Sequence, residues 1–152
     1  MTASEADRDE DRRLAEAVEM ALDAARAGEL PYASLLVDAE GTVVARACNT
    51  VRSTGDITNH PELILARHAA LTRSAEACRA LTLYTSCEPC VMCRNVIARA
   101  GIGRVVFALS TEQLHRLQPP GEPRPDAARV EYRGPSMFDR AQTPVRVFYD
   151  SV

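Results

Sequence analysis

Two short motifs, each expected at the start of a helix, constrain this chain more than any other feature. The first is the segment PCVMC at residues 89–93, in which the thiols of Cys90 and Cys93 lie three residues apart. On a helix this spacing puts both side chains on one side, where they can share a metal ion. The second is HPE at residues 60–62, where Pro61 suits the first position of a helix. The fold must therefore bring two helix N-termini together.

The apolar pattern along the chain predicts an α/β fold. Strand–helix–strand alternation after residue 60 implies parallel strands, and the predicted class is a three-layer α/β/α sandwich in a single domain over residues 1–152. Residues 1–9 are expected to be disordered, and 119–126 form a Pro-rich loop. Helices are expected at about 10–27, 61–74, 90–100 and 111–117, with a C-terminal helix and tail over 136–152, and strands at 32–38, 42–48, 81–85, 104–109 and 129–133.

Composition and charge are those of an ordinary globular protein. Of the 152 residues, 46% are hydrophobic and 26% are charged. No run approaches the ~20 apolar residues of a membrane span, and the acidic N-terminus lacks the features of a secretory signal. We therefore expect a cytoplasmic protein with no membrane partner. The net charge of -3 weakly disfavours a nucleic-acid partner, because such proteins usually present a basic face.

The cysteines favour metal or redox chemistry over disulfides, because their number, 5, is odd and three of them cluster at Cys87, Cys90 and Cys93. C-x-x-C alone would also fit a redox pair or half of a structural zinc site. Together with His60 it predicts one Zn²⁺ per chain, bound by His60, Cys90 and Cys93. Three protein ligands leave the fourth position open for water, which is typical of a catalytic zinc. A fourth ligand, for which Cys87 is the alternative, would close the site.

Glu62, two residues after His60, is the candidate catalytic residue. Zinc lowers the pKa of bound water toward ~7, so that hydroxide can attack a ring carbon that bears an amino group. Protons must then move from that water to a ring nitrogen and to the departing ammonia. One carboxylate near the metal, but not bound to it, can shuttle these protons. The alternative is that Glu62 is merely an acid favoured at a helix start.

The pairing of H-x-E with P-C-x-x-C resembles the signature of zinc deaminases. The segments ELPYASLLVD, ACNTVRSTGDITNHPE and LTLYTSCEPCVMCRNVIARAGIGRVVFAL are similar to the cytidine deaminase-like superfamily, in its nucleobase and tRNA-adenosine deaminase branch, which includes guanine deaminases. This resemblance implies a five-stranded mixed sheet, a homodimer and an active site near a subunit interface. It also implies that Asn49 binds the substrate base. Glu88 looks like a helix-cap acid that orders the cysteine loop.

One residue inside the motif departs from the family pattern. The family usually has Ala between His and Glu, and its backbone N–H can donate to the substrate, whereas Pro61 has no N–H. We expect a hydrolase acting on the C–N bonds of cyclic amidines, with a free nucleobase or nucleoside as substrate and a purine such as guanine favoured. The alternatives are a tRNA adenosine deaminase, a non-catalytic structural zinc module and, last, a redox pair formed by Cys90 and Cys93.

Overall fold

The computed structural model describes residues 4–121 and 129–151, in two compact units that span Met1–Pro120 and Gly121–Val152. Each unit is described by itself, and a single domain over the whole chain stays a prediction. Residues 1–3 of the expected disordered segment and residues 122–126 of the Pro-rich loop lie outside the described residues. No helix in the described part of the chain is long and apolar enough to span a membrane.

The first unit contains a mixed sheet of 4 strands in the order β2-β1-β3-β4. The central strand β1 pairs antiparallel with both β2 and β3, whereas β3 and β4 are parallel. In the register of β1 and β3, Ser34 lies opposite Thr85, so both side chains face the same side of the sheet. The strands are β1 (Ala33–Val37), β2 (Val43–Cys48), β3 (Thr82–Cys87) and β4 (Arg104–Leu109).

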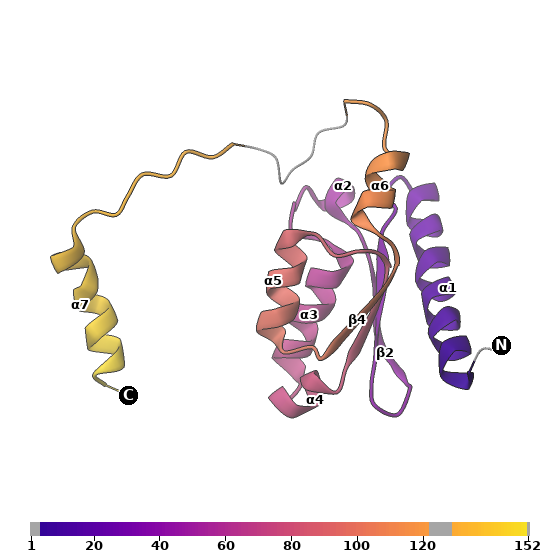
Figure 1. Ribbon diagram of the computed structural model, residues 1–152, viewed down its shortest axis with the longest axis horizontal. Helices are drawn as coiled ribbons and strands as arrows, with labels where there is room; N and C mark the ends of the chain where they lie inside the picture. Colours follow the sequence, from indigo (N-terminus) through magenta and orange to yellow (C-terminus); the bar gives the residue numbers. More distant parts are fainter. Residues whose placement is uncertain (1–3, 122–128, 152) are drawn as a thin grey trace. The chain divides into compact units, whose positions relative to one another are not determined.

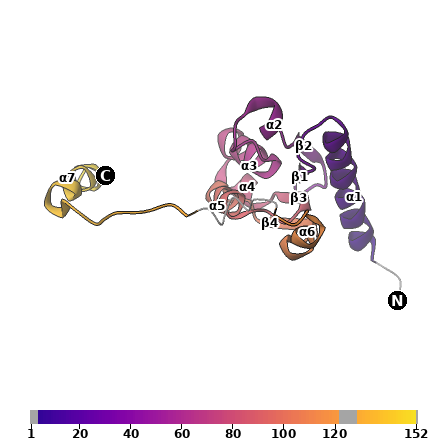
Figure 2. The same cartoon turned by 90° about the horizontal axis from the view of Figure 1, so that it is seen from above.

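Helices cover both faces of this sheet, as Figures 1 and 2 show. Helix α1 (Glu5–Arg26) packs on one face, and α3 (Pro61–Thr72) and α5 (Val91–Ala100) lie side by side on the other. The predicted three-layer α/β/α sandwich is therefore confirmed. The short helices are α2 (Val51–Thr54), α4 (Ala75–Arg79) and α6 (Thr111–Leu117), of which α2 and α4 were not expected from the sequence.

The two faces of the sheet carry separate apolar clusters. Helix α1 is amphipathic and presents small residues to the sheet, so the helix can approach closely, against Leu35 and Val37 of β1 and Tyr84 of β3. The larger cluster joins α3 and α5 to the opposite face. Its buried members include Leu36, Leu65, Ala66, Ala69, Leu83, Cys93 and Ile97. This cluster fixes the two helices on which both sequence motifs lie.

Two expectations about the ends of the chain are wrong. Residues 5–9 are helical, because Ser4 and Asp7 form a capping box that satisfies N–H groups of the first turn of α1. The five-stranded sheet is not found, since residues 129–133 form no strand and the described sheet has 4 strands. A strand needs a neighbour for its backbone groups, and the described part of the second unit contains no other strand.

The second unit contains the expected C-terminal helix. Helix α7 spans Phe138–Tyr149, and Pro144 lies inside it. The ring of Phe148 packs edge-on against that of Tyr149, with 5.1 Å between the ring centroids. Both side chains are exposed among the residues that the structure describes.

Gly103 allows a close backbone approach at the start of β4. A Cβ placed there would lie 1.9 Å from the carbonyl oxygen of Arg79, which is backbone and cannot simply rotate away. We therefore expect Gly103→Ala to lower the free energy of unfolding by about 1–3 kcal/mol, as overpacking does elsewhere. Urea denaturation measures the change. Gly134→Ala is the control, because a Cβ at that position meets nothing within 4 Å. Equal stability of the two variants would contradict this account of Gly103.

Candidate active site

The candidate metal ligands lie at the N-termini of the two packed helices α3 and α5. His60 is the N-cap residue of α3, and Pro61 follows it at the first helical position, where its missing N–H costs no hydrogen bond. Cys90 is the N-cap residue of α5, and Cys93 lies in its first turn. The positive ends of both helices point at the same place, which favours the thiolate form of the cysteines.

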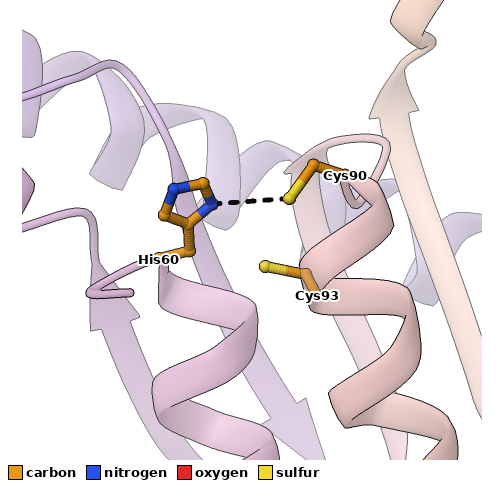
Figure 3. Close-up of side chains that lie close together, drawn as sticks. All are labelled: His60, Cys90 and Cys93. Carbon is orange, nitrogen blue, oxygen red and sulfur yellow. Dashed lines mark hydrogen bonds between the residues drawn. The ribbon is translucent and has the colours of Figure 1, made fainter. Parts of the chain in front are cut away.

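The side chains of His60, Cys90 and Cys93 converge in space, as Figure 3 shows. One possible ligand atom from each residue lies within 4.8 Å of the others, and His60 Nδ1 is 3.7 Å from Cys90 Sγ. A tetrahedral zinc with bonds of ~2.0 Å to nitrogen and ~2.3 Å to sulfur separates its ligand atoms by roughly 3.5–3.8 Å. This donor set therefore fits a zinc ion without rearrangement of the backbone.

The two thiols of the cluster differ in proton affinity. The hydrogen bond with Cys93 is the main cause that lowers the pKa of Cys90 well below its ordinary value, and the hydrogen bond with His60 adds to the effect. The same hydrogen bond between the thiols, together with burial, raises the pKa of Cys93. Cys90 is therefore the thiol of the pair that ionises first.

Cys87, the alternative fourth ligand, is not part of this cluster among the described residues. It lies at the end of β3, before the turn into α5, and is buried. Burial is the main cause that raises the pKa of Cys87 to about 11, and the Glu62 carboxylate adds to the effect. A neutral thiol away from the other three side chains leaves a fourth coordination position free for water or substrate.

Glu62, the candidate catalytic residue, lies in the first turn of α3 and is 5% exposed. Its two carboxylate oxygens have different partners. The Thr85 hydroxyl donates to Oε1 at 3.0 Å, and Oε2 lies 3.8 Å from Cys93 Sγ, on the side of the metal ligands. Burial raises the pKa of Glu62, although its own backbone N–H and Thr85 partly oppose this. A carboxyl group that lies beside a metal site without belonging to the ligand set can accept and release a proton during a reaction.

Asn49, which the sequence predicts to bind substrate, follows β2 and is fully buried. Its Oδ1 accepts a hydrogen bond from Val51 N–H at 3.0 Å, which fixes the orientation of the amide. Its Nδ2 is buried without a hydrogen-bond partner in the described part of the chain. An unsatisfied buried donor of this kind is uncommon and costs free energy unless a ligand satisfies it.

Three interactions around the site were not expected from the sequence. The Glu29 carboxylate accepts hydrogen bonds from Arg52 N–H and Ser53 N–H, and it thereby anchors the turn that follows Asn49. Glu88 accepts from Thr111 N–H at 2.8 Å and pairs with Arg94, so it caps the start of α6 as well as bracing the cysteine loop. The third is the contact of Thr85 with Glu62. No local pattern signals the contacts of Glu29 with the turn, of Glu88 with Thr111 and of Thr85 with Glu62, because 23 or 24 residues separate the partners.

Comparison with known proteins identifies the family. Residues 7–109 match the cytidine and deoxycytidylate deaminase zinc-binding region. A probable cytosine deaminase of Schizosaccharomyces pombe is 35% identical over 149 residues, which cover 90% of each chain. The chain belongs to the cytidine and deoxycytidylate deaminase family, whose members are zinc-dependent hydrolases of C–N bonds. The resemblance inferred from the motifs is confirmed, as is zinc as the family's metal, and His60, Cys90 and Cys93 form a possible site for it.

Two further proteins show how widely this framework is shared. A tRNA-specific adenosine deaminase of Haemophilus influenzae is 34% identical over 94 residues, which span only 54% of that protein. The crystal structure of guanine deaminase from Bacillus subtilis superposes with a TM-score of 0.74 at 23% identity, covering 92% of this chain and 93% of that one. This similarity confirms the cytidine deaminase-like fold.

Loss of one ligand from a three-ligand site should release the metal. We expect Cys90→Ala and Cys93→Ala to bind far less than one zinc per chain and to melt at a lower temperature, because bound metal stabilises the folded state. Elemental analysis after dialysis measures the metal. Cys87→Ala is the matched control and should keep its zinc. If Cys87→Ala loses zinc as the other two variants do, the site has four protein ligands and the open position does not exist.

Proposed function

We propose that the chain hydrolytically deaminates a free nucleobase or nucleoside, with a purine such as guanine as the expected substrate, and releases ammonia. The observation that carries this proposal is the position of Glu62, which is not one of the three possible metal ligands and turns Oε2 toward them. A structural zinc site has no need of a buried carboxyl group at that place, and burial of such a group is unfavourable unless it has a role. Deamination needs this proton carrier.

The zinc would be held by His60, Cys90 and Cys93, and when bound it supplies a water molecule whose pKa is lowered toward ~7. Glu62 would take one proton of that water on Oε2 and give it to a ring nitrogen. It would then take the remaining proton of the hydroxyl added to the ring carbon and pass it to the departing amino group, which leaves as ammonia. The position of Oε2 beside the possible metal ligands supports both directions of transfer. Burial keeps bulk water from exchanging these protons in place of the carboxyl group.

Asn49 supplies the substrate-binding donor in this proposal. Its Oδ1 is engaged by Val51 N–H, so the amide offers Nδ2–H, which suits a carbonyl oxygen or an unprotonated ring nitrogen of a base. Pro61 has no backbone N–H, whereas the family usually has Ala at this position, and the backbone N–H of that Ala can donate to the substrate. Nδ2 of Asn49 is then the donor from this side of the site that orients the base.

The tRNA adenosine deaminase alternative would require a surface that holds backbone phosphates. The net charge is -3, and arginines such as Arg129, Arg133 and Arg140 alternate with acids near the C-terminus. This balance favours a free base over a polynucleotide as substrate.

Cytosine is the second candidate substrate, because the Schizosaccharomyces pombe relative that spans 90% of this chain is named a probable cytosine deaminase.

We also propose that the protein is a homodimer. Light scattering after size-exclusion chromatography measures the mass that tests this proposal.

Ammonia release from a panel of substrates tests the proposed reaction. The panel contains guanine, cytosine, adenine, their nucleosides and an adenosine-containing anticodon stem-loop, and we expect turnover of a free base or nucleoside. Glu62→Gln keeps the size of the side chain but cannot carry a proton, so kcat should fall by about 10²–10⁴ while zinc content stays unchanged. Glu112→Gln, an exposed acid on α6, is the control. Absence of turnover on every free base and nucleoside would rule out the proposed substrate class, and an unaffected Glu62→Gln would exclude Glu62 as the proton carrier.

The Asn49 amide can be tested with an isosteric change. Asn49→Asp keeps the oxygen that accepts from Val51 N–H but replaces the Nδ2 donor with a second acceptor. We expect kcat/KM to fall by at least about tenfold, which is the loss of one buried hydrogen bond, with zinc content retained. Asn95→Asp on the exposed side of α5 serves as the control for the charge change. A kcat/KM equal to that of the unaltered protein would exclude Asn49 from substrate binding.

A further inference from the structure

Three side chains from three elements form a buried chain of hydrogen bonds that ends at Glu62. Ser34 in β1 and Thr85 in β3 are direct cross-strand partners, and their hydroxyl oxygens are 2.8 Å apart. Thr85 Oγ1 is 3.0 Å from Glu62 Oε1. Ser34 and Thr85 are fully buried, so bulk water has no access to either hydroxyl. The chain links the centre of the sheet to the first turn of α3.

The direction of these hydrogen bonds follows from the chemistry of the groups. An ionised carboxylate only accepts, so Thr85 donates its single hydroxyl proton to Oε1. The competing acceptor, the Ala33 carbonyl oxygen, is farther away at 3.5 Å. The oxygen of Thr85 is then free to accept the proton of Ser34. Every donor in the chain points toward Glu62, and hydrogen bonds in such a chain strengthen one another away from water.

This arrangement distinguishes the two oxygens of Glu62. Oε1 is held on the side of the sheet by Thr85, whereas Oε2 is turned to the metal ligands, 3.8 Å from Cys93 Sγ. Rotation of the carboxylate would break the hydrogen bond with Thr85 and leave the buried hydroxyl only the more distant Ala33 carbonyl oxygen as acceptor, which is unfavourable. The position of Oε2 is therefore determined by a residue that is not itself one of the possible metal ligands.

We propose that Thr85, supported by Ser34, is a positioning residue for the deamination reaction. Its hydroxyl group holds Glu62 so that Oε2 is the oxygen that exchanges protons with the reacting groups. The inference rests on the proposed role of Glu62. It assigns a function to a hydroxyl group in the middle of a buried strand, where apolar side chains are the rule. Thr85 acts through Glu62, so its removal changes the rate of the chemical step and leaves substrate binding unchanged.

The experiment compares Thr85→Val, Thr85→Ser and Thr82→Val in the full-length zinc-loaded protein. Valine matches the shape of threonine without the hydroxyl, serine keeps the hydroxyl, and Thr82→Val makes the same change at the other end of β3. Steady-state ammonia release is measured with the panel base that the unaltered protein turns over fastest. We expect Thr85→Val to lower kcat by about 10- to 100-fold, as losses of supporting hydrogen bonds around active groups do, with KM and zinc content unchanged. Thr85→Ser and Thr82→Val should keep nearly full kcat.

Several results would overturn the inference. One is a full kcat in Thr85→Val. Another is a kcat of Thr85→Ser as low as that of Thr85→Val, because the loss would then come from packing and not from the hydroxyl. Loss of zinc that parallels the loss of kcat would mean that Thr85 acts through the metal ligands. Glu62→Gln separates this inference from the proposed function. If Glu62→Gln is inactive and Thr85→Val is fully active, only the role of Thr85 fails. Full activity of Glu62→Gln would remove the proton-carrier role on which the inference rests, whereas absence of turnover by the unaltered protein on every free base and nucleoside would remove the proposed function itself.

Discussion

The packing of α3 against α5 on one face of the sheet is the constraint on which the rest of the site depends. His60 and Cys90 are the N-cap residues of these helices, so the metal ligands meet only if the two N-termini meet. Leu65, Ala66 and Ile97 lie in the buried cluster that holds the helices together. Cys93 belongs both to this cluster and to the ligand set. The site is thus an extension of the core, which holds its geometry by close packing.

The sheet contributes what the helices cannot supply, namely the orientation of the groups around the ligands. Pairing of β1 with β3 places Ser34 and Thr85 behind Glu62, and the end of β2 delivers Asn49 to a turn that Glu29 anchors. Glu62 and Asn49 each have one atom held by a hydrogen bond, and in the proposed reaction each uses its other polar atom. For Glu62 the second atom is Oε2, and for Asn49 it is Nδ2. Groups fixed in this way need little reorganisation during a reaction, which is a main source of enzymatic rate enhancement.

The same framework is found in proteins named for different substrates, among them a probable cytosine deaminase, a tRNA-specific adenosine deaminase and a guanine deaminase. The ligand set and the proton carrier define a reaction type, and the shape and polarity around them select the ring. Pro61 illustrates the distinction, because it preserves the helix start that presents His60 and Glu62 while it removes a backbone donor. A fold hosts several functions when the chemistry and the recognition lie on separable residues.

The sequence by itself determined the candidate ligands, the candidate proton carrier, the helices that bear them and the α/β class. Those features are local, since three-residue spacings and helix starts are written into a few adjacent positions, as in PCVMC and HPE. Only the tertiary structure showed that Thr85 holds Glu62, that Glu88 reaches the start of α6, and that residues 129–133 form no strand. These depend on which segments become neighbours in space. Alternating apolar residues around Val130 and Tyr132 give a strand pattern, but a pattern becomes a strand only where another strand accepts its hydrogen bonds.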